Sequence, residues 1–154
     1  MIRSSEEQPY LMINTSNIEE AKRLLKKEQP LKIVLAQNDE FNRKISEQAL
    51  FDIILSLEKG NRKNKIRQID SGLNHVLSNI ISKRKIAIGI DLEEIRCLEP
   101  KQKGERLAKI KQNIKISRKY RVNIAIKTKS LKNARDVLNA LGSSTQQNTE
   151  AIVF

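Results

Sequence analysis

The chain has few of the residues on which several common kinds of functional site depend. Its 154 residues include one cysteine (Cys97), one histidine (His75), no tryptophan and five isolated glycines. A single cysteine excludes an internal disulfide framework and a multi-cysteine zinc site. Isolated glycines leave no glycine-rich loop of the kind that binds the phosphates of a nucleotide. We therefore expect no cofactor bound to the protein itself.

Long apolar runs are also absent. No run approaches the roughly 18 residues of a membrane-spanning helix, and the first residues, Met1 to Glu7, lack the apolar stretch of a signal peptide. The length is typical of one domain. These features predict a cytoplasmic protein with a single α/β domain over residues 1–154, in which segments 1–9 and 143–150 are flexible.

Aromatic residues make up only 3% of the chain. Domains that bind single-stranded RNA by stacking bases need several exposed aromatic rings. With so few rings available, some of which the core requires, such a stacking platform is not expected. Recognition of the backbone and shape of structured RNA or of a duplex fits this composition better. The aromatic residues are Tyr10, Phe41, Phe51, Tyr120 and Phe154.

Positive charge is abundant and unevenly distributed. The formal net charge is +12 and the pI is near 10. Residues 1–58 carry a net charge of −2, so residues 59–154 carry +14. Segment 59–69 has five basic residues and no acid, and segment 101–121 has nine basic residues and one acid, Glu105. Such a surplus points to a polyanionic partner, most often nucleic acid.

The two basic segments supply most of the candidate contacts to that partner. In segment 59–69 they are Arg62, Lys63, Lys65 and Arg67. In segment 101–121, lysines recur at four-residue spacing opposite an apolar stripe, where like charges weaken a helix by a few tenths of a kcal/mol each. Because this cluster of like charges lowers the stability of the helix, we expect a bound polyanion to compensate for the repulsion. The candidate contacts on this helix are Lys111, Lys115, Arg118 and Lys119, and Lys109 belongs to the same cluster of like charges.

Short apolar runs rich in β-branched residues alternate with amphipathic segments. Such alternation predicts a mostly parallel sheet covered by helices. Because a complete eightfold barrel usually needs about 200 residues or more, the length allows an open sheet or a reduced TIM-like (β/α) barrel of about six strands and five helices. The strands are expected over residues 10–13, 31–36, 52–55, 85–90, 123–127 and 151–153.

Polar residues before the amphipathic segments indicate where the helices start. Ser16 and Glu19 have the spacing of a capping box, and Ser71 and Ser130 are candidate N-caps. A long helix is expected over about 103–120. The helix after Ser71 is expected to bury Leu73, Val76, Leu77 and Ile80.

Enzymatic alternatives rest on acidic residues. Asp91 follows one predicted strand and Asp52 opens another, and carboxylates in such positions can hold a divalent cation. A metal-dependent nuclease or hydrolase using Asp52 and Asp91 is therefore the competing function. His75 and Cys97 have no partner in any nucleophile motif, so a catalytic role is not expected for either.

The segment Asp70-Ser71-Gly72-Leu73-Asn74-His75-Val76-Leu77 resembles the protein component 3 family of archaeal ribonuclease P and its eukaryotic relatives. Three further stretches resemble the family in the same order along the chain. They are Asn42-Arg43 with the strand 52–55, Ile86-Ala87-Ile88, and Gln112-Asn113-Ile114 through Val122. The resemblance covers roughly residues 30–142.

The resemblance implies a TIM-barrel-like, non-catalytic subunit of an endoribonuclease. Family members bind the catalytic RNA of ribonuclease P, and the complex removes 5′ leaders from precursor tRNA. The RNA, with Mg²⁺, carries out this hydrolysis. A small ferredoxin-like subunit, component 2, pairs with component 3 in a heterotetramer. Under this interpretation Asn74 and His75 are structural or RNA-contacting residues, and Arg43 is a further candidate RNA contact.

The chain is shorter than the family pattern. Family proteins usually begin with a strand bearing an aspartate and a histidine, and a further β/α unit, before the segment that matches residues 10–13. The barrel is therefore expected to be reduced. A third possibility is a general basic RNA-binding or ribosome-associated protein of α/β fold.

Overall fold

Six parallel strands form one sheet in the computed structural model, which describes residues 9–60 and 69–154. Each strand pairs with the next one in sequence, so the order in the sheet is β1-β2-β3-β4-β5-β6. Strands rich in isoleucine and valine suit such a buried parallel sheet. They are β1 (Leu11–Ile13), β2 (Lys32–Leu35), β3 (Ile53–Leu55), β4 (Ala87–Asp91), β5 (Ile124–Lys127) and β6 (Ile152–Val153).

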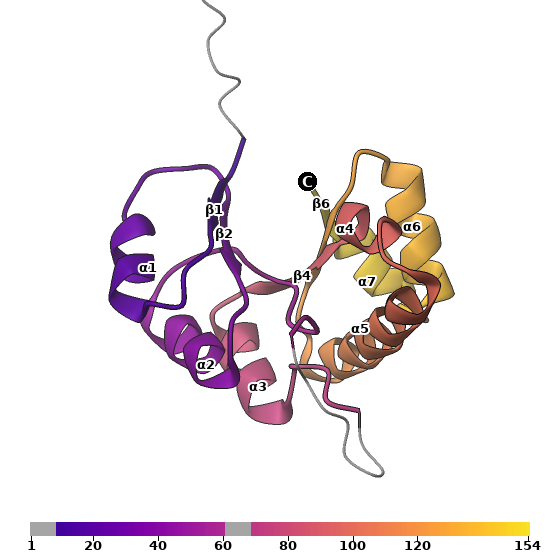
Figure 1. The fold of residues 1–154 in the computed structure, drawn as a ribbon, viewed down its shortest axis with the longest axis horizontal. Coiled ribbons are helices and arrows are strands. Elements are labelled where there is room, and N and C mark those ends of the chain that lie inside the picture. Colours follow the sequence, from indigo (N-terminus) through magenta and orange to yellow (C-terminus); the bar gives the residue numbers. More distant parts are fainter. Residues whose placement is uncertain (1–8, 61–68) are drawn as a thin grey trace, which may run out of the picture.

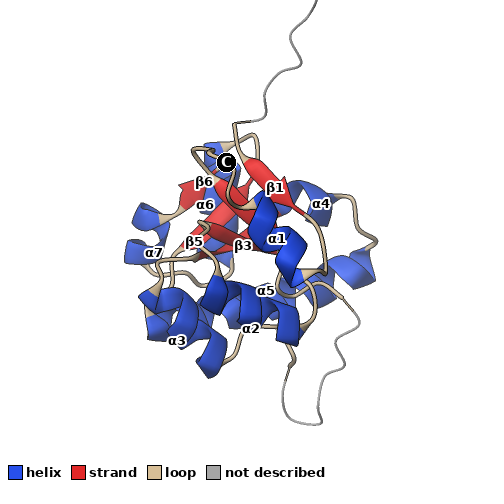
Figure 2. Ribbon diagram, turned by 90° about the vertical axis from the view of Figure 1, so that its left-hand side faces the viewer, coloured by secondary structure: helices blue, strands red, loops and turns tan. Residues whose placement is uncertain are grey.

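Helices cover the outer side of this sheet (Figures 1 and 2). None of the described helices is long and apolar enough to span a membrane. They are α1 (Ile18–Leu24), α2 (Asp39–Gln48), α3 (His75–Lys83), α4 (Leu92–Arg96), α5 (Pro100–Tyr120), α6 (Leu131–Ala140) and α7 (Thr145–Glu150).

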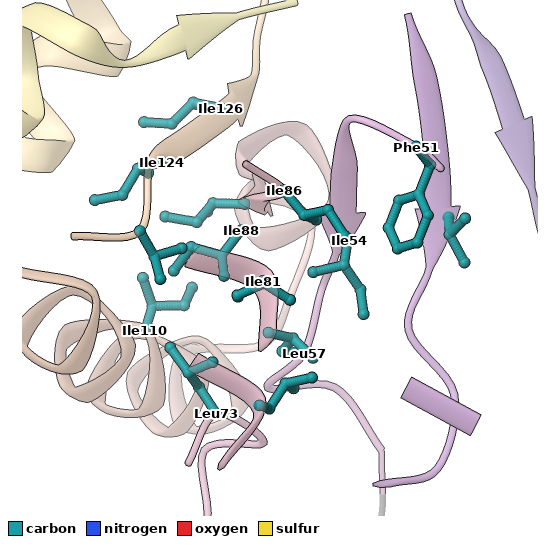
Figure 3. Packing of buried hydrophobic residues seen from close by; sticks show 14 of the residues in the cluster. Phe51, Ile54, Leu57, Leu73, Ile81, Ile86, Ile88, Ile110, Ile124 and Ile126 are labelled. Atoms are coloured by element: carbon teal, nitrogen blue, oxygen red, sulfur yellow. The ribbon is translucent and has the colours of Figure 1, made fainter. Parts of the chain in front are cut away.

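The side chains of the strands alternate between two apolar layers. The outer layer lies between strands and helices, where Ile88 and Ile124 of the sheet pack with Ile110 of α5 (Figure 3). The inner layer contains Ile33, Ile53 and other side chains on the opposite face of the strands. Because all the helices of the described residues lie on the outer face, the side chains of the sheet itself fill the inner layer, as in a barrel.

The two edge strands approach each other without pairing. Tyr10, just before β1, and Phe154, just after β6, both pack into the inner layer, and their rings meet edge to face with centroids 5.7 Å apart. No β1–β6 pairing occurs among the described residues. Figure 1 shows β1 and β6 facing each other on the open side. The expected fold is confirmed as α/β with an open, TIM-like sheet.

Gly89 of β4 permits the tight inner layer. A Cβ atom at this position would lie 2.7 Å from Ile53 Cγ2 and 2.8 Å from Leu55 Cδ1. Both distances are shorter than carbon atoms tolerate, so β3 could not place its large side chains against β4 if residue 89 had a side chain.

Two predicted helix starts are wrong. The N-cap of α1 is Asn17, whose side chain accepts from the Glu20 backbone N–H, and not Ser16. Helix α3 begins at His75 with Asn74 as its cap, and Ser71 is a buried loop residue. Leu73 and Leu77 are buried as predicted. The later start places Ser78 and Ile81 on the buried face in place of Ile80, and leaves Val76 40% exposed. The predicted cap Ser130 is confirmed.

Two helices were not expected. Helix α4 starts within the acidic sequence after β4, where the Asp91 side chain accepts from the Glu94 backbone N–H. The polar stretch 143–150, expected to be flexible, contains α7 instead. A capping box of Ser144 and Gln147 starts α7, and the Gln147 side chain donates to the Ile114 carbonyl of α5. Helix α7 is therefore held by hydrogen bonds and not by a stripe of apolar side chains. Because helices are predicted from such a stripe, the sequence pattern gave no sign of α7.

Candidate nucleic-acid interface

Helix α5 buries one face and presents a basic one. Ile110, Ile114 and Ser117 are buried against the sheet and α3. The other face carries four exposed cationic side chains, named here the basic row: Lys111, Lys115, Arg118 and Lys119. None of the four forms an ion pair with another described residue. Lys109 is half-buried and interacts within the protein, so it does not belong to the row.

A buried ion cluster holds the first half of α5. Arg106 donates to Glu58 across 2.8 Å and to Glu94 across 2.7 Å, so one guanidinium joins the segment after β3 to α4. Lys59 pairs with Glu94 as well, at 3.0 Å. The side chain of Glu58 is 2% exposed and that of Arg106 is 12% exposed. Removing one member of such a buried pair leaves an uncompensated charge, which costs about 3–5 kcal/mol.

Burial and pairing act against each other on these carboxylates. Burial raises the pKa of Glu58 above its usual value even though Arg106 hydrogen-bonds to it. Burial would also raise the pKa of Glu94, but hydrogen bonds from Lys59 and Arg106 outweigh it and lower that pKa. The guanidinium remains charged throughout, because its two carboxylate partners raise the pKa of Arg106 despite burial.

The middle of α5 holds the segment that precedes α3. The Gln112 side chain donates to the Ile69 carbonyl and to the Ser71 hydroxyl, and the Asn113 amide donates to the Ser71 carbonyl. At its far end, the Tyr120 carbonyl accepts from the Ser82 hydroxyl of α3. These contacts place the N-terminus of α3 beside the basic row.

Two neighbouring grooves connect three helices at this point. A groove of about 410 Å³ lies between α3 and α5 and is lined by His75, Gln112 and Lys119. A second groove of about 560 Å³ lies between α2 and α3 and is lined by Arg43 and Lys44. Both grooves are also lined by Asp39, Gly72 and Asn74. Four predicted RNA contacts therefore come together, from three helices: Arg43, Asn74, His75 and Lys119.

The individual environments of these residues differ. Asn74 uses its side-chain oxygen to cap α3 through the Leu77 backbone N–H, so it has a structural role. His75 is exposed at the first position of α3. Arg43 pairs with Glu47 at 3.1 Å, an exposed pair that is worth little in water and is weakened by salt. The remaining predicted contacts, Arg62, Lys63, Lys65 and Arg67, lie outside the described residues.

The acidic pair proposed for metal chemistry is not brought together. Asp52 precedes β3 and accepts from the Lys32 backbone N–H at the start of β2. Asp91 ends β4, caps α4 and lies 3.5 Å from Lys127. Because Ile53 pairs with Ala87, Asp52 and Asp91 are about five residues apart along the strand direction, or about 16 Å. No cluster of metal-ligating side chains occurs within residues 9–60 and 69–154.

Sequence reasoning missed the residues that position α5. Arg106 and Glu58 are 48 residues apart, and both are charged residue types that pattern analysis assigns to solvent. Gln112 and Asn113 carry no cap or periodicity signal. The resemblance to component 3 did include the segment that begins at Gln112, and this was the single available indication that these amides matter.

Comparison with known proteins gives a structural match. No protein-family model matches the chain, and no curated protein does. The chain is similar to a chain in the cryo-EM structure of archaeal ribonuclease P with mature tRNA, with a TM-score of 0.73 and 18% sequence identity over 92% of the present chain. The two chains share one fold. The present chain covers 63% of the length of that protein.

Proposed function

We propose that this protein is an RNA-binding subunit of ribonuclease P and a member of the protein component 3 family. The observation that carries the proposal is the fold shared with a chain of archaeal ribonuclease P over 92% of the present sequence. The segment around Asn74 and His75, which resembles the family, independently points the same way. The basic row supplies the surface that such a role requires.

In this role the protein supports the RNA and does not cleave the substrate. The catalytic RNA, with Mg²⁺, removes the 5′ leader from precursor tRNA. Cationic side chains on α5 neutralise RNA phosphates and release counterions, which makes binding dependent on salt. His75 and Arg43 extend this surface across α3 and α2. A component 2-like small subunit is the proposed protein partner, in a heterotetramer.

A cleavage assay tests the division of labour between protein and RNA. Purified protein is incubated with precursor tRNA and Mg²⁺, alone and together with the ribonuclease P RNA and the small subunit. We expect no cleavage by the protein alone, and 5′-leader removal by the RNA at lower Mg²⁺ when the protein is present. Cleavage by the protein alone would overturn the proposal, and so would an unchanged Mg²⁺ requirement.

A further inference from the structure

Two of the five aromatic rings of the chain are buried, and the other three are half-buried and packed against the protein. Phe41 and Phe51 are buried in the outer layer, and Tyr10 and Phe154 pack on each other in the inner layer. The fifth ring, Tyr120, is half-buried against the outer layer, and Lys119 Nζ lies 5.5 Å from its centroid. The segments 1–8 and 61–68 contain no aromatic residue. The chain therefore has no row of exposed rings on which unpaired bases could stack.

The basic row, in contrast, is straight and held in place. Lys111, Lys115 and Lys119 lie one turn apart, so the row extends about 12 Å along α5. Arg106 holds the helix before the row through two carboxylates. Asn113 holds it within the row, and the Tyr120 carbonyl holds it at the end. Because the positions of these lysines on α5 are fixed, they suit a nucleic acid whose phosphates are regularly spaced, as in a double helix.

Resting on the proposed function, we propose that the basic row, with His75 at its side, binds the sugar–phosphate backbone of double-helical RNA and not unpaired RNA. A-form RNA is recognised largely through shape and through phosphate and 2′-hydroxyl contacts. These contacts need cationic and polar side chains, which the basic row and His75 supply. Recognition of single strands draws on about 1–3 kcal/mol of stacking per base. Tyr120, half-buried in the groove, is one ring and not a row on which successive bases could stack.

Binding of two RNA probes tests the inference with the full-length protein. One probe is a hairpin with a fully paired stem, and the other is an unstructured strand with the same number of nucleotides. Affinities are measured by fluorescence anisotropy over a series of salt concentrations. We expect the hairpin to bind at least about tenfold more tightly, because the strand lacks the stacking that would compensate for its irregular backbone.

Matched variants test the surface. Lys111→Gln, Lys115→Gln and Lys119→Gln are combined in one protein, and Arg23→Gln, Lys26→Gln and Lys27→Gln in a control. Both sets remove three exposed charges, and Figure 1 places α1 and α5 on opposite sides of the molecule. Glutamine and lysine have similar helix propensities. For the hairpin, we expect the α5 variant to reduce the salt slope of log K by up to about three, at about one per phosphate contact, and the control to leave it near that of the wild type.

The outcomes separate this inference from the proposed function. Equal or tighter binding of the unpaired strand would overturn the inference while leaving an RNA-binding subunit intact. An equal loss of slope in both variants would overturn the assignment to α5. Failure of the wild-type protein to bind either RNA at low salt would overturn the proposed function as well.

Discussion

The rings of Tyr10 and Phe154 meet edge to face, with an angle of 83° between their planes. This contact joins the two ends of a six-stranded sheet whose edge strands share no hydrogen-bonded pair in the described structure. At the open side, packing of these two side chains holds the edge strands near each other, whereas backbone hydrogen bonds hold neighbouring strands together elsewhere in the sheet. Met12 of β1 and Ile152 of β6 pack against the same inner layer.

Replacing Phe154 with alanine should destabilise the protein by about 1–3 kcal/mol, less than for a fully buried ring because Phe154 is half-buried. Urea unfolding measures the change. Phe154→Leu keeps a large apolar side chain and should lose less stability than Phe154→Ala. The double variant Tyr10→Leu/Phe154→Leu measures the ring contact itself. If its loss of unfolding free energy equals the sum of the losses in the two single variants, the contact between the rings contributes nothing to stability.

Two glycines should respond to alanine in opposite directions. Gly89→Ala places a methyl group 2.7 Å from the Ile53 side chain and should destabilise the protein by about 1–3 kcal/mol. Gly104→Ala lies within α5, where nothing is within 4 Å of the new Cβ. It should stabilise the protein by about 0.5–1 kcal/mol, since alanine is the better helix former. Thermal unfolding of the two variants tests the packing of β3 on β4, and a neutral Gly89→Ala would contradict it.

Acid should weaken the attachment of α5. Hydrogen bonds from Lys59 and Arg106 lower the pKa of Glu94 in the folded state, although burial opposes them. A lowered carboxyl pKa contributes stability that is present above the unfolded-state pKa of about 4.3. That contribution is lost as the pH falls through the folded value. Burial raises the pKa of Glu58, so the contribution of Glu58 has the opposite sign and is lost as the pH rises.

Glu94→Gln isolates the first effect. Compared with the wild type, this variant should be less stable at neutral pH and should lose less further stability as the pH falls below about 4.3. Urea midpoints measured across this range provide the comparison. Parallel pH profiles for the two proteins would show that Glu94 does not contribute through its charge.

The basic segment 59–69 is the second predicted RNA surface. Replacing Arg62, Lys63, Lys65 and Arg67 with glutamine should weaken binding of ribonuclease P RNA. It should also reduce the slope of log K against log salt by up to about four if each cation contacts a phosphate. Filter binding at several salt concentrations measures both quantities. Unchanged binding would assign the RNA surface to α5 and its neighbours alone.

Strands and the long helix were predictable because their signals are local. Periodicity located all six strands, and the apolar spacing of Ile110 and Ile114 identified the buried face of α5. The cap of α3 was misassigned because Ser71 and Asn74 are both good cap residues, and tertiary hydrogen bonds from Gln112 and Asn113 hold Ser71 in the preceding loop. Local sequence has no information about such contacts.

The candidate site was predictable only in part, for the same reason. Charge spacing identified Lys111, Lys115 and Lys119 as one exposed face, but gave no indication of the grooves that join them to α3 and α2. The separation of Asp52 from Asp91 follows from strand direction and register, which become visible only when β3 and β4 are paired. The ion cluster around Arg106 joins three residues that are far apart in the sequence, Glu58, Glu94 and Arg106, and only the fold brings them together.

Recovery of the protein with its natural partners tests the central claim most directly. The tagged protein is purified from its own cells, the bound RNA is sequenced, and the bound proteins are identified by mass spectrometry. The account predicts enrichment of the catalytic RNA of ribonuclease P together with a small component 2-like protein. Enrichment of ribosomal or other RNA, with no ribonuclease P RNA, would contradict it and indicate a general basic RNA-binding protein.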